Sequence, residues 1–366
     1  MKIKTTCFTV ILTVCLLISI PISVMGETTS HDRIVIDSLG REVVIPSNIE
    51  SVICSGAGAL RYLTYLDAED AIVGIDGMDA GSPIGRPYAM AHPEFQELPI
   101  IGDFKGFGHG TDNLEAIIAL SPDVIIKTYE TAEEVEVEQE KLQIPIIYLE
   151  YGDLGVNRET MYDSLRILGE VMGKEEKASE IISYIEGIIT DLDARTSDST
   201  VVDTPNVYIG GVNYYQTMGF DSTEPGYTPL VLVHGSNLAS GLGTDHAMVS
   251  REQIIDWDPD VIFVDISGNG ITDLIETDAY QALTAVEKDL VYGLLPYNAF
   301  TTNQETVLAN AYYIGTILYP DTFADIDPVL KADEIFTHMV GMPVFEEMNN
   351  SYGGQGLQKI LFNSVD

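Results

Sequence analysis

One segment of this chain occurs twice, and this internal repeat restricts the possible folds more than any other feature of the sequence. Residues 114–126 read LEAIIALSPDVII, and residues 251–263 read REQIIDWDPDVIF. Each copy predicts a short amphipathic helix, a turn at the Pro-Asp pair and a buried strand. Because every matched position keeps the same offset, the two copies are in register. We therefore predict two lobes of the same architecture.

A long helix is predicted between the two copies, at residues 174–196. Ala178, Ile181, Ile185 and Leu192 recur there at helical spacing, and no proline interrupts them. At helical rise this stretch would span ~35 Å, about the width of a small domain. A crossover helix inside one domain would show the same pattern. The position between the two copies favours a rigid connector of the two lobes.

The rest of the sequence alternates strands and helices, which indicates parallel sheets. The first lobe is predicted to contain a hairpin at 33–46, a strand at 49–54, a glycine loop at 55–58, a helix at 59–66, and strands at 72–75 and 99–102. The glycine loop lacks the third glycine of a dinucleotide-binding motif, because Arg61 stands in its place. We interpret that loop as a tight turn before a helix.

These patterns predict an α/β protein with two Rossmann-like lobes, each built on a short parallel sheet, and a ligand cleft between them. The expected boundaries are a signal peptide at 1–26, an N-terminal lobe at 27–156, an interlobe helical segment at 157–196 and a C-terminal lobe at 197–366.

The signal peptide is predicted from charge and hydropathy. Lys2 and Lys4 precede an uncharged, mostly apolar run from Thr5 to Met25, and small residues surround the expected cleavage point at Gly26. The run is also long enough to stay uncleaved as a membrane anchor. Both outcomes place the body of the protein outside the cytoplasmic membrane, either secreted or tethered to its outer face.

Composition excludes several classes of function. The chain has 57 acidic and 18 basic residues, a formal charge of −39, which opposes binding to nucleic acid and to anionic membrane surfaces. Cys54 is the one cysteine outside the leader, so no intrachain disulfide is expected. The histidines lack the spacing of a metal site, and no catalytic motif is present. We expect no metal held directly by the protein, no cofactor and no enzymatic activity.

Candidate ligand-binding residues come from loops that follow strands, because open α/β sheets bind ligands at the carboxyl ends of their strands. These loops combine aromatic rings with a few polar anchors, which suits a bulky chelate or macrocycle. The candidates are Arg86, Tyr88, His92, Tyr214, Tyr215, Tyr227, His246, Tyr297 and Asn298.

Alternatives stay open for several of these candidates. Each tyrosine could equally pack in the core, and the adjacent Tyr214 and Tyr215 are expected to point in opposite directions. Arg86 is favoured for the cleft because a guanidinium pairs with ligand oxygens, whereas Arg61 is evenly balanced between the cleft and a surface ion pair. His92 or His246 as an axial ligand to a haem-like or corrin-like centre is a further alternative.

The chain resembles the substrate-binding proteins of ABC importers for ferric siderophores, haem and cobalamin. The resemblance rests on the leader, the interlobe helix, the repeated Glu-x-Ile-Ile-x-x-x-Pro-Asp-Val-Ile block and the segments RIVIDSLGREVVIP and LPYNAFTTNQETVLANAYYIGTILYP. It covers nearly the whole chain after residue 32. It implies two α/β lobes joined by one rigid helix, a ligand between the lobes and a membrane permease as partner.

The resemblance also implies docking residues and a ligand class. In the family, one surface glutamate on each lobe meets arginines of the permease, and the matching positions here are Glu115 and Glu252. An acidic residue in a first helical turn is also favoured by the macrodipole, so either residue alone would be ambiguous. The expected ligand is an iron(III) chelate of siderophore type; the alternatives are a corrinoid such as cobalamin, then haem or an oxyanion. We expect the protein to act as a monomer.

Overall fold

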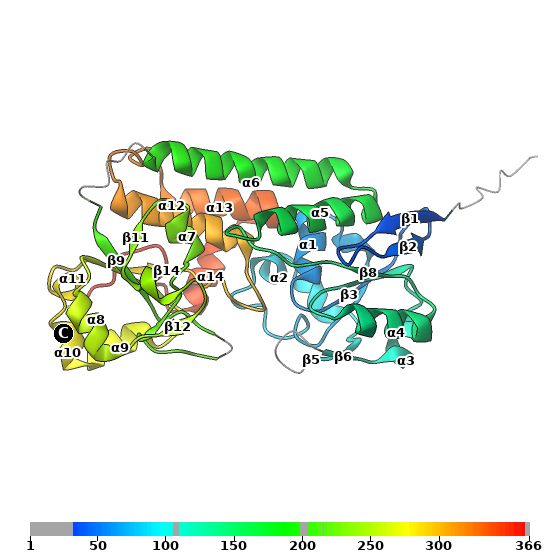
Figure 1. Ribbon diagram of the computed structural model, residues 1–366, viewed down its shortest axis with the longest axis horizontal. Coiled ribbons are helices and arrows are strands. Elements are labelled where there is room, and N and C mark those ends of the chain that lie inside the picture. Colours follow the sequence, from blue (N-terminus) through cyan, green and yellow to red (C-terminus); the bar gives the residue numbers. More distant parts are fainter. Residues whose placement is uncertain (1–31, 105–109, 198–203, 215, 363–366) are drawn as a thin grey trace, which may run out of the picture.

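The computed structural model describes residues 32–104, 110–197, 204–214 and 216–362. It contains two α/β lobes, each with a four-stranded parallel sheet (Figure 1). The strand order is β4-β3-β7-β8 in the N-terminal lobe and β11-β9-β13-β14 in the C-terminal lobe. The strands are β3 (Val52–Ser55), β4 (Ile72–Ile75), β7 (Val124–Lys127), β8 (Ile146–Tyr148), β9 (Asn206–Gly210), β11 (Ser236–Asn237), β13 (Val261–Asp265) and β14 (Val291–Leu294). The predicted fold class is confirmed, whereas the expected signal peptide lies outside the described residues.

The two copies of the repeat form the same local structure. Helix α3 (Leu114–Leu120) and helix α8 (Arg251–Trp257) begin after the capping residues Asn113 and Ser250. Each capping side chain accepts a backbone N–H from the first turn at 3.2 Å, which satisfies one of the unpaired donors of a helix start. Each helix also ends at a residue in the left-handed conformation.

The Pro-Asp pair of each copy fixes the next strand to the centre of its sheet. Asp123 Oδ2 accepts the N–H of Ser51, and Asp260 Oδ2 accepts the N–H of Asn206, both at 2.9 Å. As a result β7 pairs with β3 and β13 pairs with β9 in equivalent registers. The repeat therefore encodes the central strand pair of each lobe.

The other elements of the N-terminal lobe surround its sheet. They are β1 (Arg33–Ile36), β2 (Glu42–Ile45), α1 (Ala59–Tyr65), α2 (Pro87–Ala91), β5 (Gly102–Phe104), β6 (Gly110–Asp112) and α4 (Ala132–Leu142), with 3₁₀ turns at Glu69–Ala71 and Pro93–Glu97. The predicted hairpin is β1 and β2, paired antiparallel.

The predicted strand at residues 99–102 is wrong. Ile100 makes a single bridge to Ile75 at the end of β4, and β5 begins only at Gly102, where it pairs antiparallel with β6. Proline lacks the N–H that a ladder needs, so Pro99 cannot extend the pairing as a regular strand would.

Two helices lead from one lobe to the other, α5 (Arg158–Met172) and α6 (Glu175–Thr196). Gly173 separates them in the left-handed conformation that favours glycine. Figure 1 shows α6 lying along both lobes on one side of the molecule. Its Ile181, Ile185 and Leu192 are fully buried, as the helical spacing predicted.

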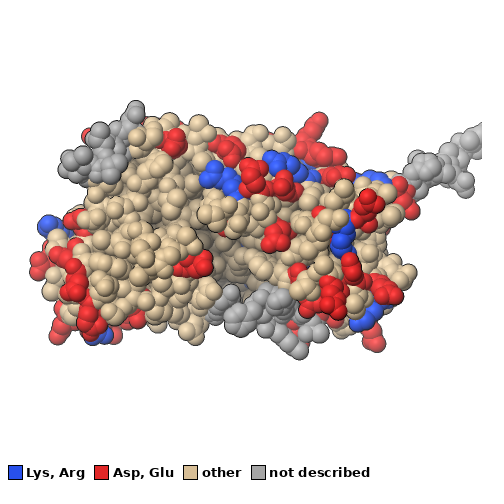
Figure 2. All heavy atoms as spheres, viewed as in Figure 1, with Lys and Arg blue, Asp and Glu red and all other residues tan. Residues whose placement is uncertain are grey.

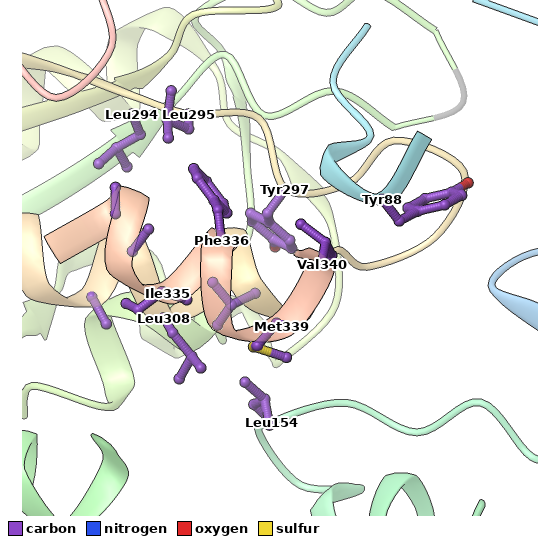
Figure 3. Packing of buried hydrophobic residues seen from close by; sticks show 14 of the residues in the cluster. Tyr88, Leu154, Leu294, Leu295, Tyr297, Leu308, Ile335, Phe336, Met339 and Val340 are labelled. Carbon is purple, nitrogen blue, oxygen red and sulfur yellow. The ribbon is translucent and has the colours of Figure 1, made fainter. Parts of the chain in front are cut away.

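Two later helices also bridge the lobes. Helices α12 (Gln304–Leu318) and α13 (Pro328–Val340) pack on each other, and α13 also contacts α1 and α2 of the N-terminal lobe. In Figure 3, Phe336 and Val340 of α13 lie beside Tyr297, and Met339 points toward Leu154 of the N-terminal lobe. One hydrophobic cluster therefore runs from lobe to lobe, and a smaller one fills the other face of the N-terminal sheet.

The remaining elements belong to the later half of the chain. They are β10 (Ser222–Thr223), α7 (Thr228–Val231), a 3₁₀ turn at Leu238–Leu242, β12 (Ala247–Met248), α9 (Gly270–Glu276), α10 (Asp278–Gln281), α11 (Thr284–Glu287) and α14 (Phe345–Ser351). None of the helices in the described ranges combines the length and the apolar character that a membrane span needs.

Candidate ligand cleft and docking surface

The carboxyl ends of the two sheets meet at the boundary between the lobes. Tyr129, which follows β7, bonds through its hydroxyl to Thr301 Oγ1 at 2.7 Å, and the Tyr151 hydroxyl, after β8, donates to the Thr302 carbonyl at 2.7 Å. Figure 2 shows a hollow between the two lobes on the side away from α6. This hollow is the candidate ligand cleft, because ligands of open α/β sheets bind beyond the carboxyl ends of the strands.

An interlobe clamp, formed by Arg61 and residues 299–303, joins the lobes beside this cleft. The fully buried Arg61 guanidinium donates to the carbonyls of Phe300 and Thr302, both at 3.0 Å, and to Asn303 Oδ1 at 3.1 Å. Phe300 and Thr301 have φ of 52° and 63°, which costs free energy for residues other than glycine. Arg61 thus holds a strained segment in place. This role is neither the cleft contact nor the surface ion pair that the sequence suggested.

Arg86 and Tyr88 lie in the interior of the N-terminal lobe. The Arg86 guanidinium donates to the Met78 carbonyl at 2.8 Å and pairs with Asp79 Oδ1 at 3.4 Å. The fully buried Tyr88 donates its hydroxyl to the same Asp79 oxygen at 2.6 Å. Burial, and then the charge of Asp76, raise the pKa of Asp79 to about 7 although Tyr88 and Arg86 oppose the shift. These side chains fix the loop after β4.

His92 occupies the junction between α2 and the end of α13. Its Nδ1 lies 2.9 Å from Glu94 Oε1, and its Nε2 lies 3.2 Å from the Val340 carbonyl oxygen. The ring also stacks on Phe95, with centroids 5.2 Å apart. The structure therefore places His92 in an interlobe packing contact and not beside the other candidates.

Tyr227 and Tyr297 form a buried pair in the C-terminal lobe. Their rings meet edge to face at 5.3 Å, and the Tyr297 hydroxyl donates to Glu224 Oε2. Burial, with the nearby charges of Asp153 and Asp245, raises the pKa of Glu224, although the Tyr297 hydrogen bond opposes the shift. Asp153 belongs to the N-terminal lobe, so its negative charge acts on Glu224 across the lobe boundary.

The structure brings Tyr214, His246 and Asn298 together at the carboxyl edge of the C-terminal sheet. Tyr214 is 43% exposed, and its ring stacks on His246 at 4.3 Å and 6°. His246 Nε2 lies 2.7 Å from Ser222 Oγ, and burial lowers the pKa of this histidine, which favours the neutral imidazole. Asn298 Nδ2 reaches the Asn213 carbonyl at 3.4 Å. Tyr215 lies outside the described residues.

Sequence reasoning missed Tyr129 and the buried ion cluster at the end of β7. Lys127 Nζ lies 2.8 Å from Asp112 Oδ2 and contacts Glu138, and Ser55 donates to Asp112 at 2.9 Å. Lys127 is the last residue of β7, the strand of the first repeat copy, and Tyr129 follows it, so that position was the available signal. Within the described residues, no group of three or more His, Cys, Asp or Glu side chains is arranged to hold a metal ion.

The two expected docking residues are exposed at equivalent places. Glu115 and Glu252 lie in the first turns of α3 and α8, and no described residue forms an ion pair with either. Figure 1 shows α3 and α8 toward opposite ends of the molecule, on the side away from α6.

Comparison with known proteins agrees with this geometry. The family model described as periplasmic binding protein matches residues 52–297, more than half of the chain. The chain belongs to this family. Members are solute-binding proteins of ABC transporters that act outside the cytoplasm with permease subunits and a small-molecule ligand, and neither family nor fold indicates catalysis.

Individual relatives differ in what their names say they bind. The molybdate-binding protein MolA of Haemophilus influenzae is 25% identical over 348 residues, 89% of this chain and 93% of MolA. A periplasmic solute-binding protein from Veillonella parvula has a similar fold, with a TM-score of 0.71, 20% identity and coverage of 88% of this chain and 97% of that one. The structure of MolA bound to molybdate superposes with a TM-score of 0.66 at 21% identity, covering 85% and 99%.

Proposed function

We propose that this periplasmic binding protein captures an iron(III) chelate of siderophore type and delivers it to its ABC permease. The observation that carries the proposal is the surface of the cleft, where Tyr214, His246, Asn298 and Tyr129 offer aromatic faces and hydrogen-bonding groups. Such a surface suits a bulky ligand with exposed rings or amides. In this proposal Arg86, Tyr88, His92, Tyr227 and Tyr297 support the cleft walls from behind.

The charges around the cleft narrow the class of chelate. Arg61, Arg86 and Lys127 stand near the carboxyl edge of the N-terminal sheet, but each is buried and bonded to groups of the chain. Asp153 and Glu224 interact across the lobe boundary. A cleft whose nearby cations are bonded to the chain, and whose lobe boundary carries negative charge, favours a neutral or positively charged chelate, such as a trihydroxamate, over an anionic one.

Calorimetric titration of the purified protein tests this preference for a neutral or positively charged chelate. Ferrioxamine B, a singly positive iron(III) trihydroxamate, is expected to bind with a Kd of about 1 μM or lower. An anionic iron(III) tris-catecholate is expected to bind at least about tenfold more weakly. Haemin and cyanocobalamin test the haem and corrinoid alternatives in the same assay. Binding of either of these, without binding of any chelate, would overturn the proposal.

Variants test whether the exposed cleft residues contact the ligand. Tyr214→Ala and His246→Ala are each expected to weaken ferrioxamine B binding by about tenfold, because each removes half of the stacked pair. His234→Ala is the matched control, since His234 pairs with Asp193 near the end of α6, away from the cleft. Unchanged affinity in both cleft variants would contradict the site.

Molybdate is the second candidate ligand. The observation that favours it is the similarity to MolA, which extends over most of both chains. Molybdate is a small dianion, so it would need free hydrogen-bond donors or cations, which the acidic groups near the lobe boundary do not provide. Sodium molybdate is therefore the competing probe in the titration, and its binding in place of the chelates would establish this second function.

We also propose that the protein acts as a monomer on the outer face of the cytoplasmic membrane, secreted or tethered, and that Glu115 and Glu252 dock to arginines of the permease. The support is their exposure at equivalent positions of two similar lobes. Charge reversal of both residues is expected to abolish uptake of labelled iron while the affinity for ferrioxamine B stays unchanged.

A further inference from the structure

The two copies of the repeat each place one isoleucine in the core and the next one in solvent. Ile117 and Ile254 are fully buried under their sheets. Ile118 and Ile255, at the next position of each copy, are 53% and 38% exposed. A single exposed aliphatic residue is ordinary on a protein surface. The same exposure at two positions that the repeat equates calls for a common cause.

Each exposed isoleucine shares a helix face with the unpaired glutamate of its copy. Residues three apart on a helix are neighbours, so Glu115 adjoins Ile118 on α3 and Glu252 adjoins Ile255 on α8. Pairing with a basic neighbour of the same lobe would satisfy these glutamates, and the described residues offer neither of them such an ion pair. Each lobe thus presents one carboxylate beside one aliphatic side chain.

These two surfaces lie on different lobes, one on each side of the cleft. Helices α3 and α8 run toward β7 and β13, so their first turns lie at the carboxyl-end side of the sheets, where the cleft opens. Figure 1 places both helices on the side of the molecule opposite α6. A partner that contacts both surfaces therefore spans the boundary between the lobes, where the cleft lies.

We propose that Ile118 and Ile255 are apolar anchors of the docking surface, each acting with its neighbouring glutamate. The occupant is the outward-facing surface of the ABC permease, with a basic side chain next to an apolar hollow at each of the two contacts. The glutamates supply orientation and association rate, whereas burial of the isoleucines slows dissociation. This inference rests on the proposed transport function and adds residues that charge alone would not identify.

The two surfaces are similar but not identical. The position after Ile118 is Ala119, and the equivalent position after Ile255 is Asp256; both are exposed. Arg251, at the start of α8, lies over the Tyr280 ring at 5.7 Å, so its charge is directed at the same lobe. The C-terminal surface therefore carries more negative charge than the N-terminal one.

Binding of the full chain to its permease complex in nanodiscs, measured by biolayer interferometry, tests the proposal. The double variant Ile118→Ser/Ile255→Ser is expected to raise the dissociation rate about tenfold and to keep the salt dependence of association. Glu115→Lys/Glu252→Lys is expected to abolish binding. The control is Ile34→Ser/Leu330→Ser, which changes two residues of 58% and 68% exposure on other surfaces.

The outcomes separate the two proposals. If the glutamate variant loses binding while the isoleucine variant dissociates no faster than the control, the apolar anchors are overturned and the transport function stands. If wild-type protein that binds ferrioxamine B does not bind the permease at all, the proposed delivery to the permease is wrong, and the inference about the anchors is overturned with it. A faster-dissociating isoleucine variant with unchanged melting temperature and unchanged ferrioxamine B affinity supports the anchors.

Discussion

At the residue scale, buried polar groups in this protein serve structure where the sequence suggested ligand contact. Arg86 is an example, because its guanidinium donates to the Met78 carbonyl and pairs with Asp79 inside one loop. A buried cation needs such partners, since leaving it unpaired costs several kcal/mol. The sequence does not distinguish a cleft arginine from an interior one, because it does not show which groups lie within reach of the guanidinium.

Asp79 carries a prediction about pH. Burial raises its pKa to about 7, well above the value of an unfolded chain, so the folded protein holds this proton more tightly. The contribution of Asp79 to the free energy of unfolding therefore favours the folded state below pH ~4 and is lost as pH rises toward ~7. Asp79→Asn keeps an acceptor for Tyr88 and removes the titration.

The measurement is urea unfolding of wild type and Asp79→Asn between pH 4 and pH 8. The free energy of unfolding of the variant, relative to wild type, is expected to rise with pH across this range. The shared background of other titrating groups cancels in this difference. A relative stability that stays constant or falls with pH would contradict a raised pKa at Asp79.

At the element scale, the repeated helices show how a short sequence pattern specifies burial. In both α3 and α8 the first isoleucine of the Ile-Ile pair faces the sheet and the second faces solvent. Consecutive residues of a helix point about 100° apart, so only one isoleucine of each pair can face the sheet.

Alanine substitution within the pair tests this orientation. Ile117→Ala and Ile254→Ala are each expected to lower the free energy of unfolding by about 2–4 kcal/mol, because each opens a cavity in the core. Ile118→Ala and Ile255→Ala, as matched controls, are expected to change it by less than about 0.5 kcal/mol. Chemical denaturation measures all four, and equal losses within a pair would mean that the helix faces are assigned wrongly.

At the scale of the whole molecule, the lobes are joined by more than the connecting helix. Helix α6 runs along both lobes, but the interlobe clamp adds hydrogen bonds from Arg61, and Gln304 donates to the Gly152 carbonyl at 3.4 Å. The continuous hydrophobic cluster through α12 and α13 would also have to be exposed if the lobes separated. These features together predict a rigid two-lobe body.

Scattering and stability measurements on Arg61→Met test this rigidity. In wild type, ferrioxamine B is expected to change the radius of gyration by less than about 1 Å. Arg61→Met is expected to lower the free energy of unfolding by about 3 kcal/mol, because buried acceptors of the clamp lose their donor. It is also expected to give a larger radius of gyration without ligand.

The control for Arg61→Met is Arg166→Met, which removes an arginine that is 52% exposed and paired with Asp163. That change is expected to alter stability by no more than about 1 kcal/mol, because exposed ion pairs contribute little. A large ligand-induced change in the wild-type radius of gyration would show that the clamp opens during binding.

The sequence by itself determined the fold class, because the repeat and the helical and strand periods report local burial, which is a property of consecutive residues. The family resemblance also implied surface positions for Glu115 and Glu252, and both residues are exposed. Only the tertiary structure decided what Arg61 and His92 contact, since their partners are more than 200 residues away in the sequence. It also decided that Arg86 bonds within its own loop. The pairing of Tyr214 with His246 was likewise decided there, because two loops far apart in the sequence meet at one edge of a sheet.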